Sequence, residues 1–220
     1  VVNTICNYLD HNAVINSPLT ASVHIPFALR RPTDWSQLAS DLANKEVRNF
    51  FYFGHGWKKG IGYIEDTNRS LCAVRLADLL GNKLNAGTNA NQHVYRFVFL
   101  FGCRTAYMEP WWLRILGIKS KKLCAAFGVP AKRLTLEELQ KYGLQPCAFV
   151  GFRSKVWRGS YTSQLFRNYL DAIENFFWTW PRNRDGGGTP YTLEEALNET
   201  LPGSLKDVLV IYGYPGLTFR

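Results

Sequence analysis

Four short apolar runs stand out along the chain, and glycines or polar residues bound each of them. They are Phe50–Phe53, Phe97–Phe101, Ala148–Phe152 and Val208–Tyr212. None alternates apolar with polar positions, so each run is typical of a strand covered on both faces, as in a parallel sheet. A further strand is expected at Val2–Tyr8, and "IGYIED" (61–66) predicts a short hairpin arm.

Helical patterns fill the segments between these runs. A helix is expected at Trp35–Leu42, where Asp34 can cap its start. The segment 70–81 predicts a second helix that ends at Gly81 and carries its apolar side chains roughly on one side. Those side chains are Leu71, Val74, Leu76 and Leu79.

Helix starts are also predicted later in the chain. Thr135 with Glu138, and Thr192 with Glu195, match the capping box, in which the two side chains satisfy backbone N–H groups. The longest helix is expected from about Ser160 to Trp178. Its apolar face would consist of Leu165, Phe166, Tyr169, Leu170, Ile173 and Phe177.

This alternation of strands and helices predicts an α/β fold, with a mostly parallel central sheet of about six strands and helices on both faces. The 220 residues are enough for one sizeable domain. The glycine-rich loop at 181–190 is too short to separate two domains. We therefore expect a single domain over residues 1–220, and the Val at position 1 is compatible with excision from a longer protein.

Composition narrows the class of protein. Hydrophobic residues make up 46% of the chain, which supports a substantial core and argues against disorder. No apolar run approaches the roughly 20 residues that cross a membrane, and no secretory signal opens the chain, so a cytoplasmic location is expected. The five cysteines form no CxxC pair and no Cys/His cluster, so no metal or other cofactor is expected.

A net charge of +9 raises the question of a nucleic-acid partner. The basic residues are scattered rather than gathered in one tract. This favours a solvated basic surface over nucleic-acid binding, which stays as the alternative.

Two chemically reactive side chains follow two of the predicted strands. His55 ends "FFYFGHG" between two glycines, and Cys103 stands in "RFVFLFGCRTA" at the matching place. In parallel sheets, functional groups gather beyond the carboxyl ends of the strands, so the two would meet if their strands are neighbours. A thiolate is a strong nucleophile, and a nearby imidazole can activate it and then protonate a leaving amine. The backbone N–H groups of Gly56 and Cys103 could stabilise a developing oxyanion.

A Gly-His-Gly after a strand is, on its own, typical of an ordinary turn, and a Cys after a strand is typical of packing. The two together, in this order and at this separation, are a more specific sign of catalysis. This pair resembles the caspase-like cysteine peptidases of clan CD, in which a His in "HG" is followed about fifty residues later by a Cys. The likeness is closest to the CHAT domain family, whose strands end in Gly-His-Gly and in Cys-x-Thr. "AFVGFRSKVW" (148–157) and "VLVIYGYPGLTF" (208–219) resemble its later strands, so the likeness covers about Phe50 to Phe219.

The resemblance implies a cysteine endopeptidase acting on protein or peptide substrates, without a cofactor. Cys103 would be the nucleophile, His55 the general acid/base, and the N–H groups of Gly56 and Cys103 the oxyanion hole. It also implies an attached sensor or repeat domain, or a regulatory partner, that switches the activity on. The chain departs from the family pattern at Ala106, where Gly is usual, and at Tyr214, where Asp is common.

Substrate contacts are expected after the third strand, at Arg153, Trp157 and Arg158, a region that walls the pocket in caspase-like folds. An aromatic residue at an edge with solvated arginines is the equal alternative. If Arg153 or Arg158 points into the substrate pocket, an acidic substrate residue is favoured. If Glu109 or Asp66 points into it instead, a basic one is favoured.

Two other functions compete with the peptidase. One is a catalytically silent caspase-like scaffold or interaction module, against which the presence of both reacting residues counts. The other is a basic nucleic-acid-binding α/β domain. The remaining candidates are expected to be structural: Cys124 and Cys147 as buried residues, and His93 as a structural or surface residue.

Overall fold

The computed structural model describes residues 35–62, 68, 70–84, 93–107, 123–156, 163–184 and 187–219. Their contacts divide the chain into two compact units. One unit holds two β-sheets with helices α2, α3, α5 and α6, and the other holds α7, α8 and α9. The single-domain organisation stays a prediction.

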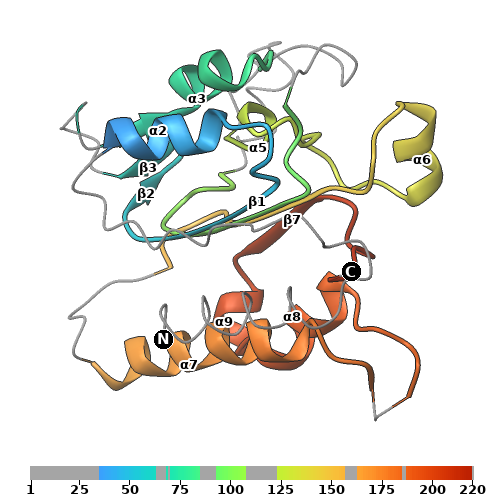
Figure 1. The fold of residues 1–220 in the computed structure, drawn as a ribbon. Coiled ribbons are helices and arrows are strands. Elements are labelled where there is room, and N and C mark those ends of the chain that lie inside the picture. Colours follow the sequence, from blue (N-terminus) through green and yellow to red (C-terminus); the bar gives the residue numbers. More distant parts are fainter. Residues whose placement is uncertain are drawn as a thin grey trace, which may run out of the picture. The chain divides into compact units, whose positions relative to one another are not determined.

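The main sheet has four strands in the order β1-β5-β6-β7 (Figure 1). These are β1 (Asn49–Phe53), β5 (Phe97–Phe101), β6 (Ala148–Phe152) and β7 (Leu209–Gly213). The first three run parallel, and β7 runs antiparallel to β6. The sheet is therefore mixed and mostly parallel, and β1, β5 and β6 all end at one edge, which we call the carboxyl edge.

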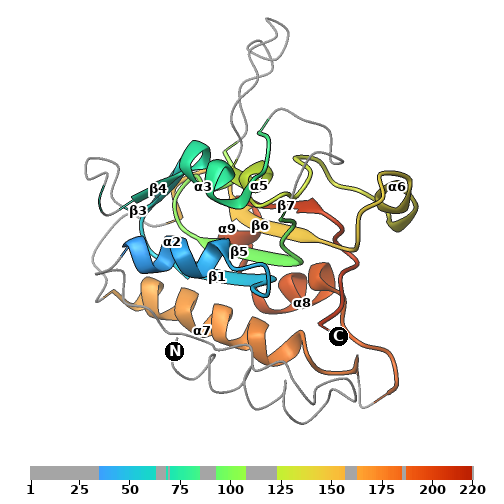
Figure 2. The same ribbon diagram turned by 45° about the horizontal axis from the view of Figure 1, so that its top comes forward.

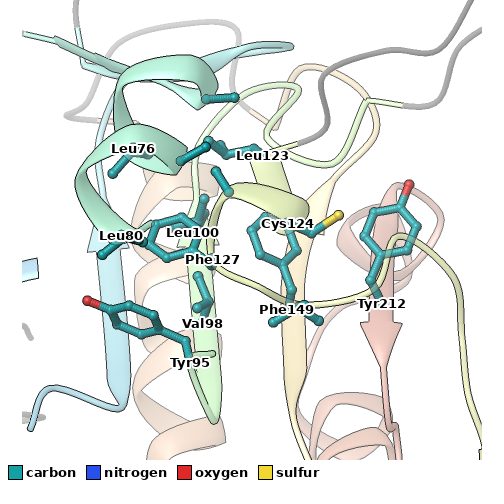
Figure 3. Packing of buried hydrophobic residues seen from close by; sticks show 14 of the residues in the cluster. Leu76, Leu80, Tyr95, Val98, Leu100, Leu123, Cys124, Phe127, Phe149 and Tyr212 are labelled. Carbon is teal, nitrogen blue, oxygen red and sulfur yellow. The ribbon is translucent and has the colours of Figure 1, made fainter. Parts of the chain in front are cut away.

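Strands β5 and β6 are buried along their whole length, which explains why their sequences do not alternate. On one face, Val98, Leu100 and Phe149 pack with side chains of α3 (Ala73–Leu80) and α5 (Leu123–Ala126), as Figure 3 shows. Helix α2 (Trp35–Ala43) adds Ala39 and Leu42 to the same core.

The opposite face of this sheet is aromatic. Phe53 of β1 stacks on Phe101 of β5 with ring centroids 5.2 Å apart, and Phe51 meets Phe99 edge to face at 5.5 Å. Such pairs contribute about 0.5–1.5 kcal/mol beyond the area they bury. They hold β1 and β5 in register at the end where the candidate residues follow.

A small antiparallel sheet of order β2-β3-β4 begins where β1 ends (Figure 2). It consists of β2 (Gly56–Trp57), β3 (Gly60–Gly62) and β4 (Ser70–Cys72). The first two residues of the predicted hairpin arm belong to β3, which pairs with both neighbours, and residues 63–66 lie outside the described residues.

The helical unit contains α7 (Gln164–Thr179), α8 (Leu193–Thr200) and α9 (Gly203–Lys206). Both predicted capping boxes are present, at Thr192 before α8 and at Thr135 before α6 (Leu136–Lys141) of the sheet unit. The hydroxyl of Tyr169 in α7 lies 3.1 Å from that of Ser204 in α9, which joins these two helices. Within the described ranges, no helix combines the length and the apolar composition that crossing a membrane requires.

The four predicted strands agree with the structure to within one residue at each end. The α/β class and the mostly parallel sheet are confirmed. The described residues supply four strands to the main sheet, so the expected total of about six and the placing of helices on both faces stay predictions. The strand expected at Val2–Tyr8 lies outside the described residues.

Two predicted helix faces are wrong in part. Residues 70–72 form strand β4, so the helix starts at Ala73 and its 3.6-residue period buries Ala73, Leu76, Ala77 and Leu80. Val74 and Leu79 are instead 39% exposed each. Leu165 lies in the first turn of α7, which begins at Gln164, and is 52% exposed, whereas the buried face starts at Phe166.

Candidate active site

The loops that carry His55 and Cys103 lie side by side at the carboxyl edge. The parallel register of β1 and β5 aligns Phe53 with Phe101, and His55 and Cys103 are each the second residue beyond these positions. The N–H of Gly54 donates to the carbonyl of Phe101 at 3.1 Å, which extends the pairing one step past the strands. His55 is exposed and Cys103 is partly buried, so neither is sealed in the core.

Glycines allow the two loops to touch through their backbones. A Cβ added at Gly56 would lie 2.7 Å from the Thr105 methyl group and 3.1 Å from the carbonyl oxygen of Cys103. One added at Gly102 would lie 3.0 Å from the carbonyl oxygen of Gly54. The glycines around His55 therefore serve a close approach of backbone to backbone.

The backbone at His55 is anchored by two hydrogen bonds. Its carbonyl accepts one from the hydroxyl of Tyr52 and one from the N–H of Gly62, both at 2.8 Å. Tyr52 is buried in the core, and Gly62 belongs to β3. The imidazole is thus presented from a segment tied to both sheets.

The turn after Cys103 is held against the neighbouring strand β6. Arg104 N–H donates to Ser154 O at 2.9 Å, and Ala106 N–H donates to Phe152 O at 3.0 Å. Arg104 has a φ of 58°, and no other non-glycine residue in the described ranges has a positive φ. That left-handed conformation costs roughly 1–2 kcal/mol for a residue with a Cβ, so the surrounding contacts must impose it.

Arg153 follows β6 directly and lies at the same edge of the sheet. Its side chain is exposed, and its guanidinium donates to the carbonyl of Asp207 at the start of the β7 segment. Its own N–H donates to Val208 O at 2.8 Å. Trp157 and Arg158, like Glu109 and Asp66, lie outside the described residues.

Further cations surround this edge. The ammonium group of Lys58, in the turn between β2 and β3, lies 5.7 Å from the ring centroid of Tyr107, just beyond the Cys103 turn. Such contacts contribute about 0.5–1 kcal/mol at exposed sites. Arg104 and Lys155 are also exposed here.

The other candidates of the sequence are structural, as expected. Cys124 and Cys147 are buried, and burial raises the pKa of the Cys147 thiol to about 12, so it stays protonated at neutral pH. Cys72 is partly buried in β4. His93 is 4% exposed and packs beside Tyr95. No cluster of three or more His, Cys, Asp or Glu side chains suited to a metal occurs in the described ranges.

Ala106 and Tyr214, where the sequence departs from the pattern that it resembles, do not disturb this arrangement. Ala106 is buried and keeps a negative φ, so its methyl group adds no backbone strain. Tyr214 follows the end of β7, which runs antiparallel, and therefore lies at the edge opposite Cys103.

Two residues that hold this site were not singled out from the sequence. Thr105 is 2% exposed and Tyr52 is 9% exposed, and both place a hydroxyl group at the carboxyl edge. A short polar residue directly after an apolar strand is the available signal for Thr105, because Thr side chains readily bond to nearby backbone groups. Tyr52 looks like any other aromatic residue of its strand.

No family model, no curated protein and no solved structure matches the chain.

Proposed function

We propose that this chain is a cysteine endopeptidase with a caspase-like fold, in which Cys103 and His55 form the catalytic dyad. The observation that carries the proposal is the parallel pairing of β1 with β5, because it brings both loops to one edge with their backbones in contact. The further strands and the helices on both faces of the sheet that such a fold requires belong to this proposal.

The chemistry begins with proton transfer from the Cys103 thiol to His55. The thiolate attacks the carbonyl carbon of the peptide bond, and the carbonyl oxygen takes up negative charge. His55 gives its proton to the leaving nitrogen as the C–N bond breaks, which leaves an acyl group on the sulfur. A water molecule then gives a proton to His55 and attacks the thioester carbon. The C–S bond breaks, the acid is released, and His55 returns the proton to the sulfur of Cys103.

The oxyanion would be stabilised by the N–H groups of Cys103 and Gly56. In the described part of the chain, no backbone carbonyl takes the N–H of Cys103, which supports its assignment as a donor to substrate. Gly56 lies against the carbonyl of Cys103, so the N–H groups of Gly56 and Cys103 are on neighbouring parts of the two loops.

The substrate is a protein or peptide, and Arg153, Trp157 and Arg158 are proposed to contact it. The exposed position of Arg153 beyond β6, beside the Cys103 turn, supports its part in this set. Regulation by an attached sensor or repeat domain, or by a separate partner, and a cytoplasmic location complete the proposal.

A thiol-directed peptide electrophile tests the activity directly. We expect covalent labelling of the wild-type chain that Cys103→Ala abolishes and that His55→Gln slows by at least about 100-fold. Cys72→Ala serves as the matched control, because it removes the partly buried thiol of β4, and its labelling should stay at the wild-type rate. A peptide library cleaved by the wild type and not by Cys103→Ala would then give the cleavage preference.

Labelling that survives Cys103→Ala would assign the reactivity to another thiol and end the proposal. No labelling of Cys103 under any activating condition would favour the catalytically silent scaffold instead.

A further inference from the structure

Thr105 is a buried polar residue that bonds to two neighbouring strands. Its hydroxyl oxygen lies 3.1 Å from the carbonyls of Leu100 and Gly102, and it donates its single proton to one of them at a time. The same oxygen accepts the N–H of Phe152 in β6 at 3.2 Å. Because a buried hydroxyl is costly unless it is paired, this network defines where the Cys103 turn lies against β6.

The methyl group of Thr105 faces the other loop. It is the atom nearest to the position of a Cβ on Gly56, at 2.7 Å, and it lies 3.2 Å from the corresponding position on Gly102. The hydroxyl group therefore holds the loop of Cys103, while the methyl group rests on the loop of His55. One side chain therefore contacts both loops that carry the proposed dyad.

We infer that Thr105 is a positioning residue that sets the separation and orientation of Cys103 and His55. It acts through the backbones of Gly102 and Gly56 and has no part in the reacting atoms. The inference rests on the proposed function, since it assigns a purpose to the contact between the two loops.

The expected effect follows from the steep distance dependence of charge interactions and of proton transfer. A thiolate is stabilised by an imidazolium only at close range, and a displacement of about 1 Å can cost about 100-fold in rate. A loosened turn should therefore weaken the coupling between the two side chains even if the fold is retained.

Two substitutions separate the two ends of the side chain. Thr105→Val keeps the shape and the methyl group but leaves the N–H of Phe152 without its acceptor, and we expect Cys103 labelling to slow by about 10- to 100-fold. Thr105→Ser keeps the hydroxyl group and loses only the methyl contact, so it should slow Cys103 labelling less than Thr105→Val does. Thr200→Val is the matched control, because it removes a hydroxyl that bonds to Ala196 O in helix α8.

The decisive measurement is the rate of Cys103 alkylation by iodoacetamide as a function of pH, with and without His55→Gln. In the wild-type background, His55→Gln should slow the alkylation of Cys103 at neutral pH, because the imidazole that takes up the thiol proton is gone. In the Thr105→Val background the same change should have a much smaller effect, while in Thr200→Val it should match the wild type. A residue with a merely structural role would not alter this difference.

Each outcome is informative. If His55→Gln slows the alkylation of Cys103 equally with Thr105 and with Val at that position, the positioning role is wrong and the peptidase proposal stands. If His55→Gln has no effect even in the wild type, the two side chains are uncoupled, and the proposed function fails with the inference. If Thr105→Val does not fold, Thr105→Ser gives the same comparison with the hydroxyl network intact.

Discussion

His93 is buried in surroundings that on balance oppose its protonation. Its Nε2 lies 2.9 Å from the carbonyl oxygen of Val47, which accepts a hydrogen bond from the ring N–H. Its Nδ1 is buried without a hydrogen-bond partner in the described part of the structure, and its ring stacks on Tyr95 at 4.7 Å. Burial lowers the pKa of His93 below its usual value, the positive charges of Arg48 and Lys45 add to this effect, and the Val47 bond opposes it.

This lowered pKa predicts a loss of stability in mild acid. The unfolded chain takes up a proton at His93 near pH 6.5, whereas the folded protein does so only at lower pH, so the free energy of unfolding falls as the pH drops below about 6.5. For one proton the slope cannot exceed about 1.4 kcal/mol per pH unit. Urea unfolding between pH 7.5 and 5, compared with His93→Gln, measures it. Parallel loss of stability in both proteins would assign the acid dependence to other groups.

At the scale of elements, the contact between the β1 and β5 loops depends on a missing side chain at Gly56. An added methyl group would overlap the Thr105 methyl at 2.7 Å, and we expect Gly56→Ala to cost about 1–3 kcal/mol of stability and to slow Cys103 labelling. Thr105→Ser removes the opposing methyl group. The double variant Gly56→Ala/Thr105→Ser should therefore lose less stability than the sum of the losses in the two single variants.

Urea unfolding of the four proteins of this cycle gives the coupling. Gly188→Ala is a suitable control, because nothing lies within 4 Å of the added Cβ, and it should be close to neutral. Additive effects of Gly56→Ala and Thr105→Ser would mean that the two loops do not meet at this contact.

The elements themselves could be predicted because their signals are local. The runs of β5 and β6 are apolar throughout, and Thr135 and Thr192 each have a Glu three residues later. The same information placed His55 and Cys103 after strands. Their being neighbours follows only from the pairing of β1 with β5, which joins segments far apart in the sequence.

Features that depend on neighbouring strands could not be predicted in the same way. The left-handed conformation of Arg104 is imposed by bonds from its turn to Ser154 and Phe152 in the segment of β6, and nothing in "CRTA" indicates it. Likewise, the start of α3 was predicted too early because Ser70–Cys72 pairs with β3, and this tertiary pairing outweighs the helical pattern.

At the scale of the sheet-containing unit, charge is unevenly arranged around the candidate site. The described segments at the carboxyl edge are 54–60, 102–107 and 153–156, which follow β1, β5 and β6, and 207–208, which precedes β7. Asp207 is the one acidic residue among them. The cations there are all exposed: Lys58, Lys59, Arg104, Arg153 and Lys155. Three of these cations lie close together in the fold, because the N–H of Arg104 donates to the carbonyl of Ser154, which stands between Arg153 and Lys155 in the sequence. Such an edge attracts an acidic polypeptide and slows a basic one.

We therefore expect substrates with acidic residues near the cleaved bond to react faster than their amide counterparts. The measurement is the ratio of labelling rates for two peptide electrophiles that differ only in Glu against Gln. In the wild type this ratio should favour Glu and should fall as salt is added, because exposed charges are screened over about 10 Å at 0.1 M ionic strength. Lys58→Glu/Lys155→Glu should lower it by about 10-fold or more, since both side chains are exposed and neither carries a backbone contact of the loops.

The matched control is Lys132→Glu/Lys141→Glu, which changes the net charge by the same amount in helix α6 and in the segment just before it. Figure 1 shows α6 and the small sheet at opposite ends of this unit, so a general effect of net charge would appear in both double variants and a local one only in the first. An unchanged Glu/Gln ratio in Lys58→Glu/Lys155→Glu would leave the edge as an ordinary solvated surface. Salt-sensitive binding of an oligonucleotide that this same double variant abolishes would instead assign the cations to nucleic acid, because phosphate contacts carry that dependence.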